Sequence, residues 1–263
     1  MDLYFAPLAC SMASRIALYE AGIGAEDPED GAPSAAVRFL QVDARAKRLV
    51  ADGSDYFAVN AMGQVPALRL EDGGLLTENA AVLQHLAERF PAAGLAPVSR
   101  LGRDRLRQWL SFIGTELHAA VFAPLLDPEA PEEAKTYARG KALIRLTRLA
   151  SHLNGREHLL DEGFSVADAY LATVLNWAPY AGIELERWPI LKAWHDRMLA
   201  RPSIARALAE ERALYLAEQA ARRAAARGGN PVEAGGSLER LDGPGRAGAG
   251  HHPAQDGVEV AVG

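Results

Sequence analysis

The chain contains one cysteine, Cys10, which directly precedes a segment with helical spacing. The surrounding residues read "FAPLACSMASRIALYEAG". A helix start at this point would present unpaired backbone N–H groups and a positive dipole end to the sulfur, and both lower the pKa of a thiol. Arg15, about one turn further on, would add a positive charge. The alternative is that Cys10 is a small apolar residue of the core.

A dithiol motif is absent here, because residues 10–13 read Cys-Ser-Met-Ala. A lone activated thiol cannot resolve its own mixed disulfide, so it needs an external thiol, and glutathione is the obvious one. A single cysteine also cannot form an intramolecular disulfide. It is therefore typical of a reducing compartment, and we expect a cytoplasmic protein.

The composition narrows the range of partners. The chain has 263 residues, 49% of them apolar, and a formal net charge of −6. A nucleic-acid partner or an acidic membrane surface would favour a basic face, so we expect neither. No stretch reaches the roughly 18 consecutive apolar residues of a membrane span. We also expect no metal site.

Short strands and helices alternate over residues 1–92, which we expect to form one domain. "DLYF" and "AVRFLQVD" are typical of strands, and a helix between them, over 11–21, ends at Gly22. The stretch "GAEDPEDGAPSA" is a predicted loop. "ALRLEDGGLL" predicts a β-hairpin, and the spacing of Val82, Leu83 and Leu86 predicts a helix that ends before Pro91. The order β-α-β, hairpin, helix is a thioredoxin-like layout.

Residues 98–216 are predicted to form an all-helical domain after the Gly- and Pro-rich linker "PAAGLAPVSR". Apolar side chains recur at helical spacing, as in Leu106, Leu110 and Ile113. Between Val166 and Ile183 the only charged residue is Asp168, so this helix should be buried on all sides. Ser165 and Asp168 have the spacing of a capping box at its start. The fold class is therefore α/β followed by all-α.

Residues 217–263 are expected to form a disordered Gly/Ala/Pro-rich tail. From Gly228 on, the chain holds ten of its 24 glycines and no Phe, Trp or Tyr. Such a segment cannot bury enough apolar surface to offset the entropy of ordering.

Four segments together resemble the glutathione transferases, and specifically the bacterial beta class. They are "LYFAPLACSMASRIALYEAG", "VNAMGQVPALRLEDGGLLTENAAVLQHLAERFP", "QWLSFIGTELHAAVFAPL" and "FSVADAYLATVLNWAPY", in order over about residues 1–215. The resemblance implies a thioredoxin-like glutathione-binding domain, a helical-bundle domain and glutathione as co-substrate.

Three residues would act near the sulfur if the resemblance holds. Cys10 would form a mixed disulfide or assist the bound thiol, and Ser11 would donate to the sulfur or cap the helix. His118 would hydrogen-bond the thiol or move a proton, whereas a lone histidine on a helix is otherwise a bystander.

Further residues would bind glutathione. The resemblance makes Pro66 a cis-proline that turns the backbone of Val65 toward the cysteinyl group. Glu78 would bind the ammonium of the γ-glutamyl end, and Asn79, at a helix start, would bind its carboxylate. The alternative is that these residues only cap the helix and place an acidic side chain in its first turn, which requires no ligand. Lys47 would bind the glycyl carboxylate, with Arg48 as a rival. These predicted binding residues are Lys47, Gln64, Val65, Pro66, Glu78 and Asn79.

An apolar acceptor pocket is expected between the two domains. We predict that it is lined by Ala6, Leu8, Phe112, Phe122 and Trp177, although Phe112 and Trp177 would also suit the core. The chain departs from the family at Ala119, where a lysine is common, and at Ser111, where an asparagine is common. Both departures bear on affinity and substrate preference.

The resemblance leaves three functions open. The first is a transferase whose glutathione or cysteine thiolate attacks a hydrophobic electrophile, by conjugation, thiol–disulfide exchange or peroxide reduction. The second is a glutathione-dependent lyase or dehalogenase of aromatic catabolism, and the third is a binding protein without turnover. The family pairs as a homodimer, in which Glu116 would reach the partner's glutathione.

Overall fold

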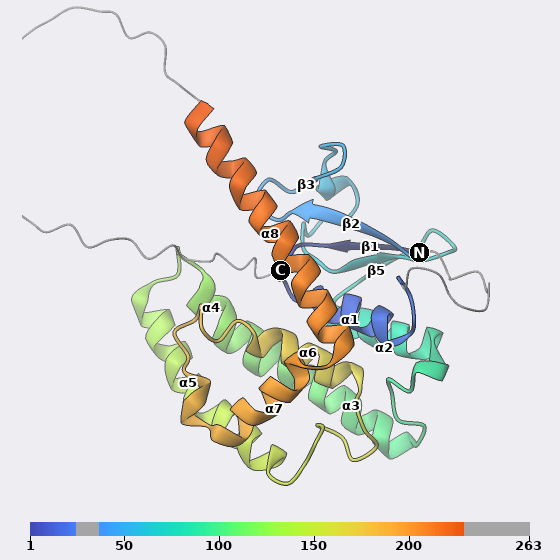
Figure 1. Cartoon of the computed structure of the whole chain (residues 1–263), viewed down its shortest axis with the longest axis vertical. Helices are drawn as coiled ribbons and strands as arrows, with labels where there is room; N and C mark the ends of the chain where they lie inside the picture. Colours follow the sequence, from blue (N-terminus) through green and yellow to red (C-terminus); the bar gives the residue numbers. More distant parts are fainter. Residues whose placement is uncertain (25–36, 229–263) are drawn as a thin grey trace, which may run out of the picture.

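The computed structural model describes residues 1–24 and 37–228 (Figure 1). Nearly all of the predicted loop "GAEDPEDGAPSA" lies outside these residues, as does the chain after Gly228.

A mixed five-stranded sheet forms the N-terminal part, in the order β3-β2-β1-β4-β5. Strand β1 pairs in parallel with β2 and in antiparallel with β4, and the pairs β4–β5 and β2–β3 are antiparallel. The predicted β-α-β unit, hairpin and helix are confirmed. The two-residue strand β3 was not predicted, because so short a strand leaves no alternating pattern. The elements are β1 (Asp2–Phe5), α1 (Met12–Glu20), β2 (Arg38–Asp43), β3 (Arg48–Leu49), η1 (Tyr56–Ala58), β4 (Ala67–Arg69), β5 (Leu75–Thr77) and α2 (Asn79–Arg89).

Helices make up the rest of the described chain. Helices α1 and α2 lie between the sheet and this helical part, where α1 packs on α6 and α2 on α3 and α6 (Figure 1). The elements are η2 (Pro91–Ala93), α3 (Arg100–Phe112), η3 (Ile113–Phe122), α4 (Ala123–Leu126), α5 (Glu132–Leu153), α6 (Val166–Leu175), η4 (Leu185–Arg187), α7 (Pro189–Leu199) and α8 (Pro202–Gly228).

Helix α6 is the centre of the helical part, and all ten of its residues are buried. It ends at Leu175, eight residues before Ile183, because Pro179 cannot continue a helix. The predicted capping box is present at its start: the Ser165 backbone N–H and hydroxyl both donate to one oxygen of Asp168, each over 2.9 Å. The second Asp168 oxygen accepts from the Leu159 N–H at 2.8 Å. The start of this buried helix is therefore satisfied by the chain itself.

The predicted start of the tail at residue 217 is wrong, because α8 continues to Gly228. Residues 217–228 are rich in alanine, which has the highest helix propensity. Arg222 pairs with Glu218 one turn earlier and with Asp43 of β2, so this part of α8 also has partners outside the helix. The predicted disorder after Gly228 lies outside the described residues.

The continuous segment Arg100–Leu126, made of α3, η3 and α4, is long and apolar enough to cross a membrane by length and composition alone. Ile113, Leu117, Val121 and Phe122 of this segment are fully buried within the protein, whereas Leu101 at its start is 61% exposed. A core helix passes the same test, and the packing of these side chains is that of a core helix.

Candidate active site

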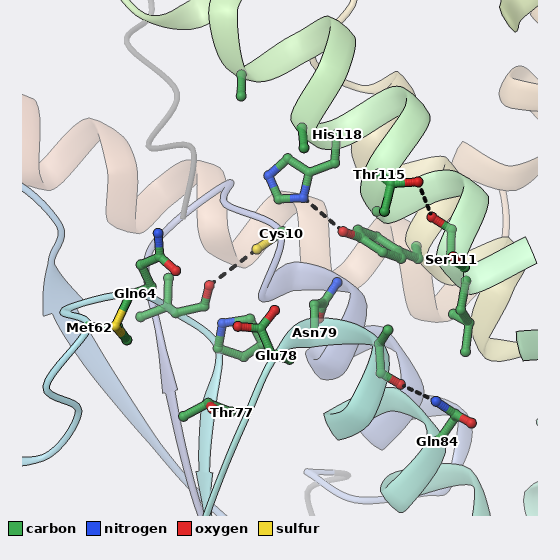
Figure 2. Close-up of a pocket in the computed structure, with 18 of the residues that line it drawn as sticks. Cys10, Met62, Gln64, Thr77, Glu78, Asn79, Gln84, Ser111, Thr115 and His118 are labelled. Carbon is green, nitrogen blue, oxygen red and sulfur yellow. Dashed lines mark hydrogen bonds between the residues drawn. The ribbon is translucent and has the colours of Figure 1, made fainter.

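Cys10 lines a cavity of about 600 Å³ between the sheet domain and the helical part (Figure 2). The β1–α1 turn contributes Cys10, the segment before β4 contributes Val65, and the start of α2 contributes Glu78 and Asn79. His118 lines the cavity from η3, a π-helical stretch, and π-helical segments are frequent at functional sites. Gln64 and Pro66 line it too, so seven of the predicted site residues meet in one place.

The sulfur of Cys10 donates to the carbonyl oxygen of Val65, at 3.2 Å, and is almost inaccessible, with 2% of the residue exposed. The Val65–Pro66 peptide bond is cis, as the resemblance implied. Gln64 lines the same cavity, and its backbone carbonyl oxygen accepts hydrogen bonds from the Tyr56 hydroxyl and the Asn60 side-chain amide.

The expectation of a lowered pKa at Cys10 is wrong for this structure. Burial raises the pKa of the thiol to about 12, and the charge of Glu78 adds to the rise. The backbone N–H groups of Cys10 and Ser11 do lower it, as a helix start should, but their effect is smaller than that of desolvation. Cys10 is therefore a protonated hydrogen-bond donor at neutral pH.

Arg15 does not assist the thiol, because its guanidinium is committed elsewhere. Its Nε donates to Glu211 of α8 at 2.9 Å, and its Nη1 donates to Glu210 at 3.2 Å. The guanidinium also lies over the rings of Phe5 and Phe39, 4.2 and 4.4 Å from their centroids. Arg15 thus joins α1 to α8.

Glu211 also holds the turn that carries Cys10. Its second oxygen accepts from the backbone N–H of Leu8 at 2.7 Å, and the Leu8 carbonyl accepts from the indole of Trp177 at 2.9 Å. Leu8 has a φ of 62°, which is unfavourable for a side chain of this kind. Two side chains of the helical part therefore fix a strained residue two positions before the thiol. No local pattern in the sequence indicated either contact.

Ser11 does not act on the sulfur as predicted. Its hydroxyl exchanges hydrogen bonds with the backbone of Ala6, at 3.3 Å to both the N–H and the carbonyl oxygen. It makes no capping bond to the first turn of α1. The Ser11 side chain braces the turn before the helix instead.

His118 forms a polar pair with Tyr170 of α6, with 2.8 Å between Nδ1 and the phenol oxygen. Burial lowers the pKa of His118 to about 4, so the imidazole is neutral at pH 7. Tyr170 lines the same cavity, and sequence reasoning missed it. The one signal was a phenol within an otherwise apolar helical segment.

Glu78 and Asn79 lie where β5 meets α2. Glu78 has a φ of 69° and a ψ of 118°, a strained conformation that typically persists at functional sites. The Asn79 side-chain oxygen accepts from Ser14 at 3.3 Å, and its buried Nδ2 lies near the phenol of Tyr170, whose pKa it lowers, without a hydrogen bond of good geometry among the described residues. Glu78 and Asn79 thus lie side by side at the edge of the cavity.

A second cavity, of about 680 Å³, adjoins the first. Gln64, Val65 and Ala123 line both cavities. Lys47 lines only the second and donates from Nζ to the Gly63 carbonyl at 2.9 Å. The exposed Arg48 donates to the Gly53 carbonyl instead, so only Lys47 is placed at a cavity.

The predicted acceptor lining is mostly wrong. Of the five residues, only Ala6 lines the second cavity. Leu8, Phe122 and Trp177 are buried in the core, and Phe112 lines a third cavity on the outer face of the helical part. Glu116 lines that third cavity as well and pairs with Arg145, whereas Ser111 and Ala119 line the first cavity.

The arrangement suits chemistry on a thiol supplied from outside the chain. Cys10 and the neutral imidazole of His118 both line the cavity and could hydrogen-bond such a thiol. Among the described residues, no group of three or more His, Cys, Asp or Glu side chains is placed to hold a metal ion.

Comparisons with known proteins agree with the fold. Residues 113–202 match the family model "Glutathione S-transferase, C-terminal domain". The chain is 41% identical over 212 residues to glutathione S-transferase GstA of Escherichia coli O157:H7, covering 80% of this chain and 98% of that one. It is also similar to the structure of a sphingomonad glutathione S-transferase complexed with glutathione, at 40% identity and a TM-score of 0.72. The beta-class enzyme of Sphingomonas chungbukensis gives the same two values, and each match covers 80% of this chain and 98% of the other.

Because the pKa of His118 falls from 6.5 to about 4 on folding, acid should destabilise the protein. At a pH between these two pKa values, His118 is protonated in the unfolded chain but not in the native protein, so the free energy of unfolding decreases as the pH falls. From pH 7 to pH 5 we expect His118 to account for a loss of about 2 kcal/mol. Urea unfolding of the wild type and of His118→Asn at both pH values measures this loss. An equal pH dependence in the two proteins would contradict the assignment.

Proposed function

The chain belongs to the glutathione S-transferase family, and on this premise we propose that the cavity around Cys10 is its glutathione site. The observation that carries the proposal is the lining of the cavity, where the strained Glu78 and Asn79 at the start of α2 lie together with Cys10, Val65 and the cis peptide bond before Pro66.

The residues of the cavity fit glutathione from end to end. Glu78 would bind the ammonium, and Asn79 the carboxylate, of the γ-glutamyl group. The backbone of Val65 and cis-Pro66 would bind the cysteinyl group, beside Cys10. Gln64, which lines both cavities, and Lys47, which lines the adjoining part of the second, would bind the glycyl carboxylate. We propose accordingly that residues 1–92 form the glutathione-binding domain and residues 98–216 the helical domain.

Glutathione supplies the thiol that, as a thiolate, attacks an electrophilic centre. The protonated Cys10 would give up its bond to the Val65 carbonyl and donate its hydrogen to that thiolate, which would stabilise the negative charge. The neutral imidazole of His118 would hydrogen-bond the sulfur, and the proton of the thiol would leave to water, because a group with a pKa of about 4 is too weak a base to hold it. Ser11 would keep the turn of Cys10 in shape rather than touch the sulfur.

This division of roles favours conjugation over chemistry centred on Cys10. Thiol–disulfide exchange through Cys10 would need its thiolate, and a pKa of about 12 leaves almost none at neutral pH. We therefore propose that glutathione is the nucleophile and that a small hydrophobic electrophile occupies the second cavity.

A homodimer is proposed as the working form, in the cytoplasm. Large apolar side chains on the outer face of α5 support it, since Tyr137, Leu143 and Ile144 are 67%, 51% and 64% exposed. Sedimentation of the full chain should give the mass of two copies, and a monomer at micromolar concentration would contradict the proposal.

Cys10→Ser and Cys10→Ala separate a hydrogen-bond donor from a nucleophile. Calorimetric titration should show one glutathione per chain in the wild type and in both variants. We expect Cys10→Ala to lower kcat/KM for conjugation at least tenfold, because hydrogen bonds to charged groups contribute about 1.5–3 kcal/mol. Cys10→Ser, which keeps a donor, should retain most of the activity. Equal and complete inactivity of both variants would identify Cys10 as the nucleophile, and no binding by the wild type would refute the glutathione site.

Glu78→Gly and Glu78→Ala separate the carboxylate from the backbone strain. Both variants lose the proposed partner of the ammonium, so both should bind glutathione at least tenfold more weakly. Only glycine tolerates a φ of 69° at no steric cost. In urea unfolding, the free energy of unfolding of Glu78→Gly should therefore exceed that of Glu78→Ala by about 1 kcal/mol. Unchanged glutathione affinity in both variants would remove Glu78 from the site.

A further inference from the structure

Four buried polar side chains form a chain of contacts between the sheet domain and the helical part. They come from α1, α2, α6 and η3, and none of these residues is more than 9% exposed. In the order of their contacts they are Ser14, Asn79, Tyr170 and His118. The last three line the cavity of Cys10, and the bond between His118 and the phenol is drawn as a dashed line in Figure 2.

The hydroxyl of Ser14 decides which way the amide of Asn79 is turned. Ser14 has one side-chain hydrogen to donate, and among the described residues its hydroxyl has one partner, the side-chain oxygen of Asn79, at 3.3 Å. The opposite amide orientation would leave this buried hydrogen without an acceptor, which is costly. The oxygen of Asn79 therefore faces Ser14, and its Nδ2 is on the side of the Tyr170 phenol.

The phenol of Tyr170 then has one direction open to its hydrogen. Burial raises the pKa of Tyr170, so the phenol is protonated at neutral pH. The amide of Asn79 lowers this pKa, as a donor beside the phenol oxygen does. Because a donor occupies the Asn79 side, the phenol hydrogen goes to its other neighbour, Nδ1 of His118, over 2.8 Å.

This contact determines where His118 carries its own hydrogen. Burial lowers the pKa of His118 to about 4, so the ring is neutral at pH 7 and one of its two nitrogens is protonated. With Nδ1 as an acceptor, the hydrogen is on Nε2. Nε2 has no hydrogen-bond partner within the described residues and is not one of their buried partnerless atoms, so it is open to the cavity.

We propose that Tyr170 is a positioning residue, which holds His118 as the Nε2–H tautomer so that the imidazole donates a hydrogen bond to the sulfur of bound glutathione. Ser14 and Asn79 set the direction of this chain of hydrogen bonds. The role at the sulfur rests on the proposed function, whereas the tautomer is a property of the free protein. An N–H at this point stabilises a thiolate, and a lone pair would repel it.

The amide of Asn79 is thereby committed to Tyr170. The carboxylate of the γ-glutamyl group is left to the backbone N–H of Asn79, which is the first residue of α2 and has no partner within the helix. Glutathione and the chain of hydrogen bonds therefore use different atoms of the same residue.

NMR of the full chain, labelled with nitrogen-15 in its histidines and free of glutathione, reads the tautomer directly. Protonated and unprotonated ring nitrogens have well separated shifts, and His118→Asn identifies the two signals of His118 by their loss. At pH 7 the wild type should show a protonated Nε2 and an Nδ1 that accepts a hydrogen bond. The Nδ1–H tautomer in the wild type would overturn the proposal.

Asn79→Asp should reverse the chain of hydrogen bonds. A carboxylate only accepts, so the Tyr170 hydroxyl should donate to it and accept from Nδ1 of His118. The positive end of α2 favours the charged form of the new side chain. We expect the Nδ1–H tautomer in this variant, and an unchanged Nε2–H tautomer would show that Asn79 does not set the direction.

Tyr170→Phe removes the hydroxyl and keeps the ring. The Nδ1 signal should move to that of a nitrogen without a hydrogen bond. With chlorodinitrobenzene as the electrophile, kcat/KM should fall about 3- to 10-fold, the usual range for one hydrogen bond. The pH of half-maximal activity should rise by about half to one unit, which is the same change expressed as a thiol pKa. The calorimetric Kd for glutathione should change less than twofold.

Thr173→Val is the matched control. It removes another buried hydroxyl of α6, which donates to the Ala169 carbonyl within the same helix. Both His118 signals and the pH profile should stay as in the wild type. A change in this control equal to that of Tyr170→Phe would assign the effect to the packing of α6 and would overturn the positioning role.

The outcomes distinguish the two proposals. If the wild type binds glutathione but Tyr170→Phe leaves the His118 signals and the pH profile unchanged, the positioning role fails and the glutathione site stands. If the wild type binds no glutathione, the glutathione site fails and the role at the sulfur fails with it, whatever tautomer His118 adopts.

Discussion

A buried ion pair between Arg15 of α1 and Glu211 of α8 is the interaction on which the rest of this structure depends. The two residues lie 196 positions apart, and the side chain of Glu211 is fully buried. One carboxylate oxygen binds Arg15 and the other binds the Leu8 N–H, so a single side chain ties the last helix to the first and to the turn of Cys10. Such a pair contributes little net stability, but the loss of one partner strands a buried charge, which typically costs about 3–5 kcal/mol. The pair therefore joins the first helix and the turn of Cys10 to the last helix, next to the cavity that carries the site.

Much of the fold could be predicted because its signals are local. Gly22 after the first helix, the Asp-Gly-Gly turn of the hairpin and Pro91 after α2 each mark a boundary within a few residues of where it occurs. The same holds for the capping box of α6. The end of α8 was missed because composition was weighed over a whole tail, although its alanine-rich beginning favours a helix.

The site could be predicted as a set of residues but not as an electrostatic environment. Spacing and family resemblance predicted one site that includes Cys10, Val65, Pro66, Glu78, Asn79 and His118, and these residues do line one cavity. The state of Cys10 follows instead from the domain that covers it, since burial outweighs the helix start. Glu211, Tyr170 and the indole of Trp177 act across 52 to 203 residues of chain. Contacts at such separations leave no periodic signal in the sequence. For the same reason, residues that were predicted to line the acceptor pocket lie in the core instead.

The burial of Cys10 has a consequence for the lifetime of the protein. An enzyme that handles reactive electrophiles risks alkylation of its own nucleophiles, and the reactive form of a cysteine is the thiolate. A thiol that is 2% exposed, hydrogen-bonded to a carbonyl and protonated at neutral pH is a poor target. The same features that leave Cys10 a weak nucleophile would thus protect it from the electrophiles that the proposed function brings into the neighbouring cavity.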